Sequence, residues 1–200
     1  MNPTKTIPAT YSLAWQVDMK KDTRLNWILQ IVGTVWFFIA AWALWQVVAV
    51  LRPEYFSMEF KTESVWDILL LLVIVVLVIF VTLTVHELVH GLSFWLFTRA
   101  RPVFGLGAGY AYAAAPDWFF PKSAYLVVGL SPLVILTLVG LAVIPIIPVA
   151  WVGSVFLAVV FNAGGAIGDL YICLRIAKEA RDILVRDSGD IFEIYRVRVE

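Results

Sequence analysis

Residues 68–90 read ILLLLVIVVLVIFVTLTVHELVH, and this stretch decides the fold class. From Ile68 to Val85 the run carries no charge, and only Thr82 and Thr84 interrupt its apolar side chains. At about 1.5 Å per residue, a helix of this length can cross a hydrocarbon core roughly 30 Å thick. The stretch therefore predicts a membrane-spanning helix.

The same run ends in the motif His86-Glu87-Leu88-Val89-His90, which contains both histidines of the chain. Residues four apart lie on one face of a helix, so two neutral imidazoles at this spacing can bind one zinc ion. Glu87 lies between them, close enough to act as a general base. Ionisable groups are costly in hydrocarbon and are usually functional there, which favours a metal site. The alternative is that both rings are hydrogen-bonding residues buried between helices.

The composition agrees with an integral membrane protein of a single domain over residues 1–200. Hydrophobic residues make up 62% of the chain and charged residues only 15%, which is outside the usual range of soluble domains. The formal net charge is zero and no basic run occurs, so nucleic acid is not an expected partner. Cys173 is the only cysteine, which excludes an intramolecular disulfide and a cysteine-based zinc cluster.

We expect an all-α polytopic membrane protein with about four transmembrane helices and a small cytoplasmic β element. Ser64 and Asp67 form a capping-box pattern at the start of the second helix. The fourth helix is expected to continue as a charged amphipathic helix to Arg186. The expected spans are about 27–51, 64–98, 123–144 and 151–175, followed by a cytoplasmic tail over 176–200.

The distribution of Lys and Arg predicts the orientation. Thirteen of these residues fall on the side of the N-terminus, whereas only Arg52 and Lys61 fall on the opposite side. Positive residues concentrate on the cytoplasmic side of membrane proteins. We therefore expect a multi-pass cell-membrane protein with both termini in the cytoplasm.

Three segments outside the expected spans have the character of strands: residues 11–17, 103–113 and 195–199. The last of them alternates apolar and charged side chains with period two. All three fall on the cytoplasmic side, so a small sheet near the HExxH helix is expected. The middle segment contains Gly105, Gly107 and Gly109, and we interpret it either as a hairpin dipping into the membrane or as an ordinary loop.

A catalytic zinc site usually has three protein ligands and a water, so a third ligand is needed. Beyond Asp67, which marks the outer end of its helix, Glu87 and Asp169 are the acidic residues inside the expected spans. Helical rise places His86 and Asp169 at the same depth, roughly 27–29 Å from the outer surface. Asp169 is therefore the expected third ligand, and pairing of Asp169 with Arg175 is the alternative.

Two sets of residues are candidates for binding substrate. Asn162 lies about two turns before Asp169 on nearly the same face, where its amide could hydrogen-bond an oxyanion or an extended substrate. Interhelical hydrogen bonding is the equally weighted alternative for Asn162. Gly105 and Gly107 could form an edge that receives a substrate strand.

These motifs resemble the site-2 protease class of intramembrane zinc proteases, and the short four-helix layout resembles the compact bacterial family called putative zincin peptidases. The resemblance runs from about Tyr11 to Arg175. It implies that His86, His90 and Asp169 bind zinc, that Glu87 is the base, and that the protein resides in a bacterial inner membrane. The site-2 pattern has Gly after the ligand Asp and a nearby proline, whereas this chain has Leu170 and no proline between Asn162 and Asp169.

The expected function is that of a membrane-embedded zinc endopeptidase, with Glu87 as general base on zinc-bound water. Its expected partners are the lipid bilayer and a membrane-protein or peptide substrate. The alternative is a non-enzymatic membrane protein, either a pseudoprotease or a metal-stabilised scaffold that binds partner helices. A diiron oxidase ranks lower, because two histidines are too few for its ligand set.

Overall fold

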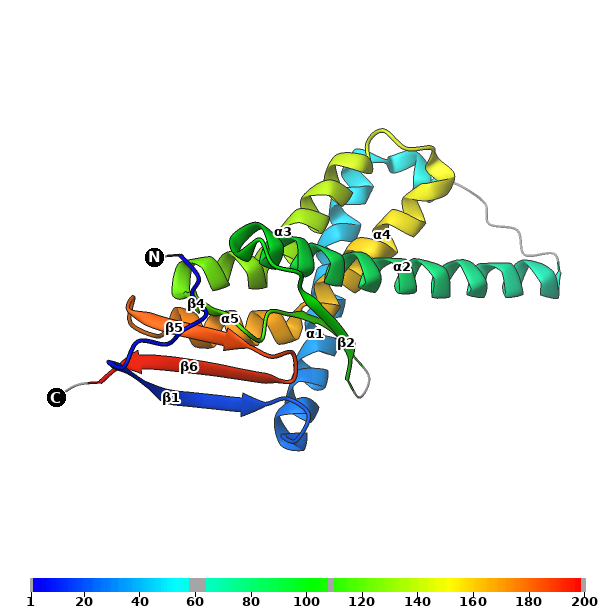
Figure 1. The fold of residues 1–200 in the computed structure, drawn as a ribbon. Helices are drawn as coiled ribbons and strands as arrows, with labels where there is room; N and C mark the ends of the chain where they lie inside the picture. The colour runs from blue at the N-terminus through cyan, green and yellow to red at the C-terminus, as the bar shows by residue number, and fades with distance from the viewer. Residues whose placement is uncertain (1, 58–63, 108–109, 199–200) are drawn as a thin grey trace.

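The computed structural model describes residues 2–57, 64–107 and 110–198, and places a helical bundle beside a four-stranded sheet (Figure 1). In chain order, the elements are β1 Tyr11–Asp18, α1 Thr23–Leu51, the 3-10 helix η1 Pro53–Ser57, α2 Val65–Thr98, β2 Val103–Leu106, β3 Ala111–Ala114, β4 Phe119–Pro121, α3 Lys122–Val143, α4 Val149–Gly165, α5 Ile167–Ala177, β5 Ile183–Asp187 and β6 Ile191–Val197.

Three described helices, α1, α2 and α3, are long and apolar enough to cross a membrane. The predicted fourth span is instead two helices, α4 and α5, which meet at a bend of 45° and could together form one broken span. The starts of α1 and α2 follow from capping. Asp22 accepts a hydrogen bond from the Leu25 N–H at 2.9 Å, so α1 begins before Trp27, and Ser64 and Asp67 form the predicted capping box.

The C-terminal segment is where the prediction of an all-α fold needs correction. A helix was expected to reach Arg186, but α5 ends at Ala177 and β5 occupies residues 183–187. Ile183, Leu184 and Val185 are buried between β4 and β6, so their apolar side chains are better satisfied in the sheet than on an exposed helix. Long-range strand pairing therefore overrides the local helical pattern.

The four-stranded sheet joins the two ends of the chain. Its order is β1-β6-β5-β4 and every pair is antiparallel, with Tyr11 opposite Val197 and Asp18 opposite Ile191. The predicted N-terminal and C-terminal strands are thereby confirmed, except that Val199 lies outside the described residues. The predicted middle segment is confirmed as a hairpin in which β2 pairs with β3, although Gly109 lies outside the described residues.

Two apolar cores hold the helices at opposite ends. One core packs the sheet against α2, α3 and α5, and its buried residues include Phe94, Phe120, Val128, Ile172, Ile176, Val185 and Ile194. The other joins α1, α4 and the end of α3, through Leu44, Val48, Ile144, Val152 and Val160. There the buried Arg52 guanidinium donates to the carbonyls of Ile144 and Ile147, both at 2.7 Å.

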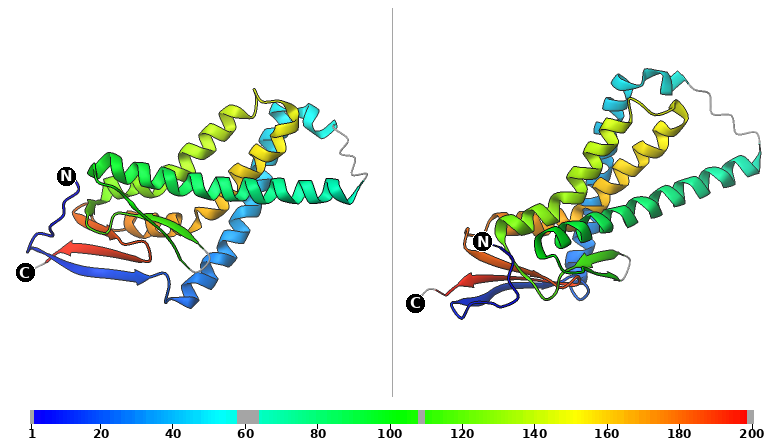
Figure 2. Two further views of the ribbon diagram at one scale, coloured as in Figure 1. Left: turned by 45° about the vertical axis from the view of Figure 1, so that its right-hand side comes forward. Right: turned by 45° about the horizontal axis from the view of Figure 1, so that its top comes forward.

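The outer half of α2 belongs to neither core. Its large apolar side chains from Val65 to Phe80 are mostly exposed, and this part of the helix diverges from α1, α3 and α4 in both views of Figure 2. The inner half carries His86 and His90, which are buried beside α3, α4 and the sheet-side core. The two cores therefore hold the HExxH end of α2 against its neighbours while its outer half presents an apolar surface suited to lipid.

Candidate metal centre

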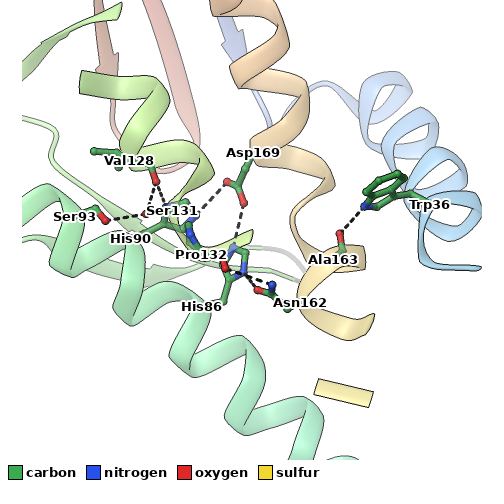
Figure 3. Close-up of polar contacts among 10 residues, drawn as sticks. All are labelled: Trp36, His86, His90, Ser93, Val128, Ser131, Pro132, Asn162, Ala163 and Asp169. Carbon is green, nitrogen blue, oxygen red and sulfur yellow. Dashed lines mark hydrogen bonds and ion pairs between the residues drawn. The ribbon is translucent and has the colours of Figure 1, made fainter. Parts of the chain in front are cut away.

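Three side chains from two distant segments meet at the inner end of α2 (Figure 3). The Nε2 atom of His86 lies 3.1 Å from Oδ2 of Asp169, and the Nε2 atom of His90 lies 3.3 Å from Oδ1 of the same carboxylate. The candidate ligand atoms all lie within 4.8 Å of one another. The structure thus brings together the three residues that the sequence predicted as metal ligands.

The geometry of these three residues fits zinc. In a tetrahedral site with ligand bonds of about 2.0–2.2 Å, neighbouring ligand atoms are roughly 3.3–3.6 Å apart. The two nitrogen–oxygen separations of 3.1 and 3.3 Å are close to that range. Two imidazoles and one carboxylate also form a donor set typical of catalytic zinc, which leaves a fourth position for water or substrate.

Hydrogen bonds on the far side of each ring orient the imidazoles. His90 Nδ1 donates to the backbone carbonyl of Val128 at 3.1 Å, and His86 Nδ1 lies 2.9 Å from Oδ1 of Asn162. The amide of Asn162 is oriented by its Nδ2, which donates to the Pro132 carbonyl at 3.4 Å, so its oxygen faces His86. The acceptors behind both rings favour protons on the two Nδ1 atoms, so each Nε2 atom would be free to bind a cation beside the carboxylate.

A break between α4 and α5 places Asp169 at the site. Helix α4 ends at Gly165 and α5 begins at Ile167, which releases the carbonyl of Ala163 from the helical pattern. The indole Nε1 of Trp36, on α1, donates to that carbonyl at 3.0 Å (Figure 3). The bend lets the first turn of α5 approach α2, and Asp169 is in that turn.

The alternative in which Asp169 pairs with Arg175 is wrong. The Arg175 guanidinium forms its ion pair with Glu179 and lies over the ring of Trp15, 5.2 Å from its centroid. Glu179 also binds Arg196 at 2.7 Å, so these charges form a separate cluster between α5 and the sheet. The Asp169 carboxylate therefore faces only the two histidines among the ion pairs of the described residues.

Glu87 lines the same cavity as the three candidate ligands but does not belong to their cluster. The cavity has a volume of about 810 Å³ and is lined by α1, α2, α3, the β3 strand and the break between α4 and α5. Glu87 and Ala113 of β3 both line this cavity. This position leaves Glu87 available for proton transfer beside the metal ligands.

The residues predicted to bind substrate have other contacts in the structure. Asn162 is fully buried and its amide is engaged by His86 and Pro132, which agrees with interhelical hydrogen bonding. A Cβ at Gly105 would lie 2.4 Å from the ring of Tyr112, and one at Gly107 would lie 2.3 Å from Tyr110. Close packing of these tyrosines explains both glycines, and their contact with a substrate stays a prediction.

Sequence reasoning missed a buried carboxyl beside the cavity. Asp187, at the end of β5, accepts hydrogen bonds from the Tyr125 hydroxyl at 2.7 Å and from the Gly189 N–H at 2.8 Å. Burial raises the pKa of Asp187 to about 6. The signal in the sequence is Gly189 two residues after Asp187, a spacing typical of a turn, and Gly189 has a φ of 87° in the structure. Both residues lie just beyond the helix that the sequence predicts to end at Arg186.

Removal of the Asp169 carboxylate tests the third ligand. Asp169→Ala should lose most of its bound zinc, because two imidazoles alone leave the ion without its charged ligand. Arg175→Ala is the matched control and should keep one zinc per chain, because Arg175 pairs with Glu179. Metal content of the two purified proteins decides the point, and tightly held zinc in Asp169→Ala would exclude Asp169 as a ligand.

Comparison with known proteins also indicates a zinc site. The model of a family described as putative zincin peptidases matches residues 79–184, slightly more than half of the chain, and this region contains all three candidate ligands and Glu87. No curated protein and no solved structure matches the chain. Membership of a zincin family implies zinc as the metal, in agreement with the donor set of His86, His90 and Asp169. The chain belongs to the putative zincin peptidase family.

Proposed function

We propose that the protein is a membrane-embedded zinc endopeptidase that cleaves peptide bonds in or near transmembrane segments. The family suggests zinc metallopeptidase activity. The observation that carries the finer proposal is the position of Glu87, which lines one cavity with His86, His90 and Asp169 at the inner end of a long apolar helix. Ligands, base and membrane-type helices therefore belong to one site.

The residues of the chain divide the chemistry between them. A bound zinc ion would supply Lewis acidity for the scissile carbonyl and for the attacking water. His86, His90 and Asp169 would hold the ion, while Asn162 and the Val128 carbonyl keep the two rings oriented. Glu87 accepts a proton from the attacking water at its carboxylate and transfers it to the leaving amine.

The β2–β3 hairpin could hold an extended segment of the substrate. The backbone carbonyls of a transmembrane helix are engaged in its own hydrogen bonds, so a substrate helix has to unwind locally before a peptide bond can be cleaved. Strand β3 pairs with β2 on one side, and among the described strands it has no partner on the other. Residues 111–113 line the cavity, so an unwound segment could add to β3 as an extra strand.

The proposed setting is a cell membrane with both termini in the cytoplasm and lipid around the helices. The bias of Lys and Arg supports this orientation, although Lys61 lies outside the described residues. The sheet, which contains both terminal strands, packs at the same end of the molecule as the metal centre. The proposal thus places the catalytic site near the cytoplasmic boundary of the membrane.

Substitution of the proposed base tests the enzymatic function. Glu87→Gln should bind zinc normally but cleave a fluorogenic transmembrane peptide at least about 100-fold more slowly, because the proton acceptor is lost. Glu193→Gln, the same change on β6 away from the cavity lining, should leave turnover unchanged. Each variant is compared with the wild type in turnover and in zinc content.

Full turnover by Glu87→Gln on a peptide that the wild type cleaves would contradict the role of Glu87. A wild-type protein that binds zinc, captures transmembrane peptides and cleaves none of them would instead favour the pseudoprotease or scaffold function.

Cysteine labelling tests the orientation. On a Cys173→Ala background, a cysteine at Ser57 should react with a membrane-impermeant maleimide added outside intact cells, because η1 lies at the outer end of α1. A cysteine at Arg181 should react only after the membrane is opened, because it lies between α5 and β5. The opposite pattern would show that the termini face outwards.

A further inference from the structure

Pro132 lies inside α3, where a proline has a direct consequence for the metal centre. It has no backbone N–H, so the carbonyl of Val128, four residues earlier, loses its helical donor. The proline ring also crowds that carbonyl and favours its displacement from the helix axis. A helical carbonyl becomes available at the level of His90.

Two other donors occupy the released Val128 carbonyl. His90 Nδ1 donates to it at 3.1 Å and the Ser131 hydroxyl donates to it at 2.8 Å. Ser131 is in turn 2.8 Å from the Ser93 hydroxyl, one turn beyond His90 on α2. A carbonyl oxygen has two lone pairs, so these two donors use its full capacity.

Pro132 is also linked to His86, indirectly, because its own carbonyl binds the Asn162 amide. That carbonyl accepts a hydrogen bond from Asn162 Nδ2 at 3.4 Å, and Oδ1 of the same amide accepts from His86 Nδ1 at 2.9 Å. The contact fixes which end of the Asn162 amide faces the ring, because a carbonyl can only accept. The hydrogen bonds that orient the His86 and His90 rings therefore both depend on Pro132 of α3 (Figure 3).

We propose that Pro132 is a positioning residue of the metal centre. By lacking an N–H it reserves the Val128 carbonyl for His90, and by its own carbonyl it orients Asn162 for His86. A proline needed only to bend α3 would not require the released carbonyl to face a metal ligand. The inference rests on the zinc site of the proposed function, and it holds whether or not the protein cleaves peptides.

Zinc affinity of Pro132→Ala gives the first test. Alanine restores a backbone N–H directed at a carbonyl whose two lone pairs are already used, so the new donor competes with the His90 ring for that carbonyl. We expect the Kd for zinc, measured by competition with a chromophoric chelator, to rise about 10–100-fold, as for other losses of a partner behind a metal ligand. A Kd within twofold of the wild type would overturn the proposal.

Two variants separate the N–H from other effects. Ser131→Ala removes a donor from the same carbonyl and adds no competitor, so it should keep the wild-type Kd. Replacement of Pro132 by lactic acid, which makes an ester bond without ring or N–H, should also bind zinc as the wild type does. A loss of affinity in the ester protein would show that the ring is what matters and would overturn the proposal even if Pro132→Ala fails to fold.

The tautomer of His90, measured by ¹⁵N NMR, distinguishes a specific effect on this ring from a general loss of stability. The chain has only two histidines, so ¹⁵N-histidine labelling reports two imidazoles. In the zinc-loaded wild type both rings should carry their proton on Nδ1, and in Pro132→Ala the His90 nitrogen shifts should change more than those of His86. Equal shifts of both rings, or of neither, would contradict the specific role of the Val128 carbonyl.

Discussion

The meeting of two imidazole nitrogens and one carboxylate inside an apolar body is the constraint on which the rest of the structure depends. An ionised or polar group buried without a partner costs several kcal/mol, whereas one ordinary hydrogen bond contributes only about 1 kcal/mol. Structural zinc sites bind with roughly 10–16 kcal/mol in small peptides, so a metal can offset such a cost where hydrogen bonds cannot. The contact between α2 and α5 is therefore best understood as a metal-dependent contact.

Two irregularities of the backbone build this contact. The break at Ala166 aims the first turn of α5, with Asp169, at α2, and the Trp36 indole satisfies the carbonyl of Ala163 that the break releases. The proline of α3 releases a second carbonyl, that of Val128, which holds His90. In a membrane each released carbonyl needs a partner inside the protein, so these irregularities persist only where side chains complete them.

Local patterns and helical rise predicted a large part of the site. The four-residue spacing of His86 and His90 and the equal depth of His86 and Asp169 follow from helix geometry. The scarcity of acidic residues within the spans and the resemblance to site-2 proteases complete the prediction of Asp169. The capping box at Ser64 and the strand at residues 11–17 are likewise local. The hydrogen bonds from His90 to Val128 and from His86 to Asn162 join residues 38 and 76 positions apart, and no local pattern contains them.

The incorrect predictions also arise from contacts between residues far apart in the sequence. Residues 178–186 were interpreted as a charged helix, because their composition suits a helix surface and β5 gains its stability only from pairing with β4 and β6. The break between α4 and α5 was missed because no proline marks it, and its stabilising contact comes from Trp36 on another helix. Asp187 was missed because its burial depends on that same sheet.

Zinc K-edge X-ray absorption of the purified protein tests the central claim, that His86, His90 and Asp169 hold one zinc ion, most directly. We expect a first shell of nitrogen and oxygen atoms at about 2.0–2.2 Å, with outer-shell scattering from two imidazoles. Cys173, the only thiol of the chain, lies one turn after Asp169 and would add a sulfur atom at about 2.3 Å if the ion bound there instead. A sulfur shell, or scattering from fewer than two imidazoles, would contradict the proposed metal centre.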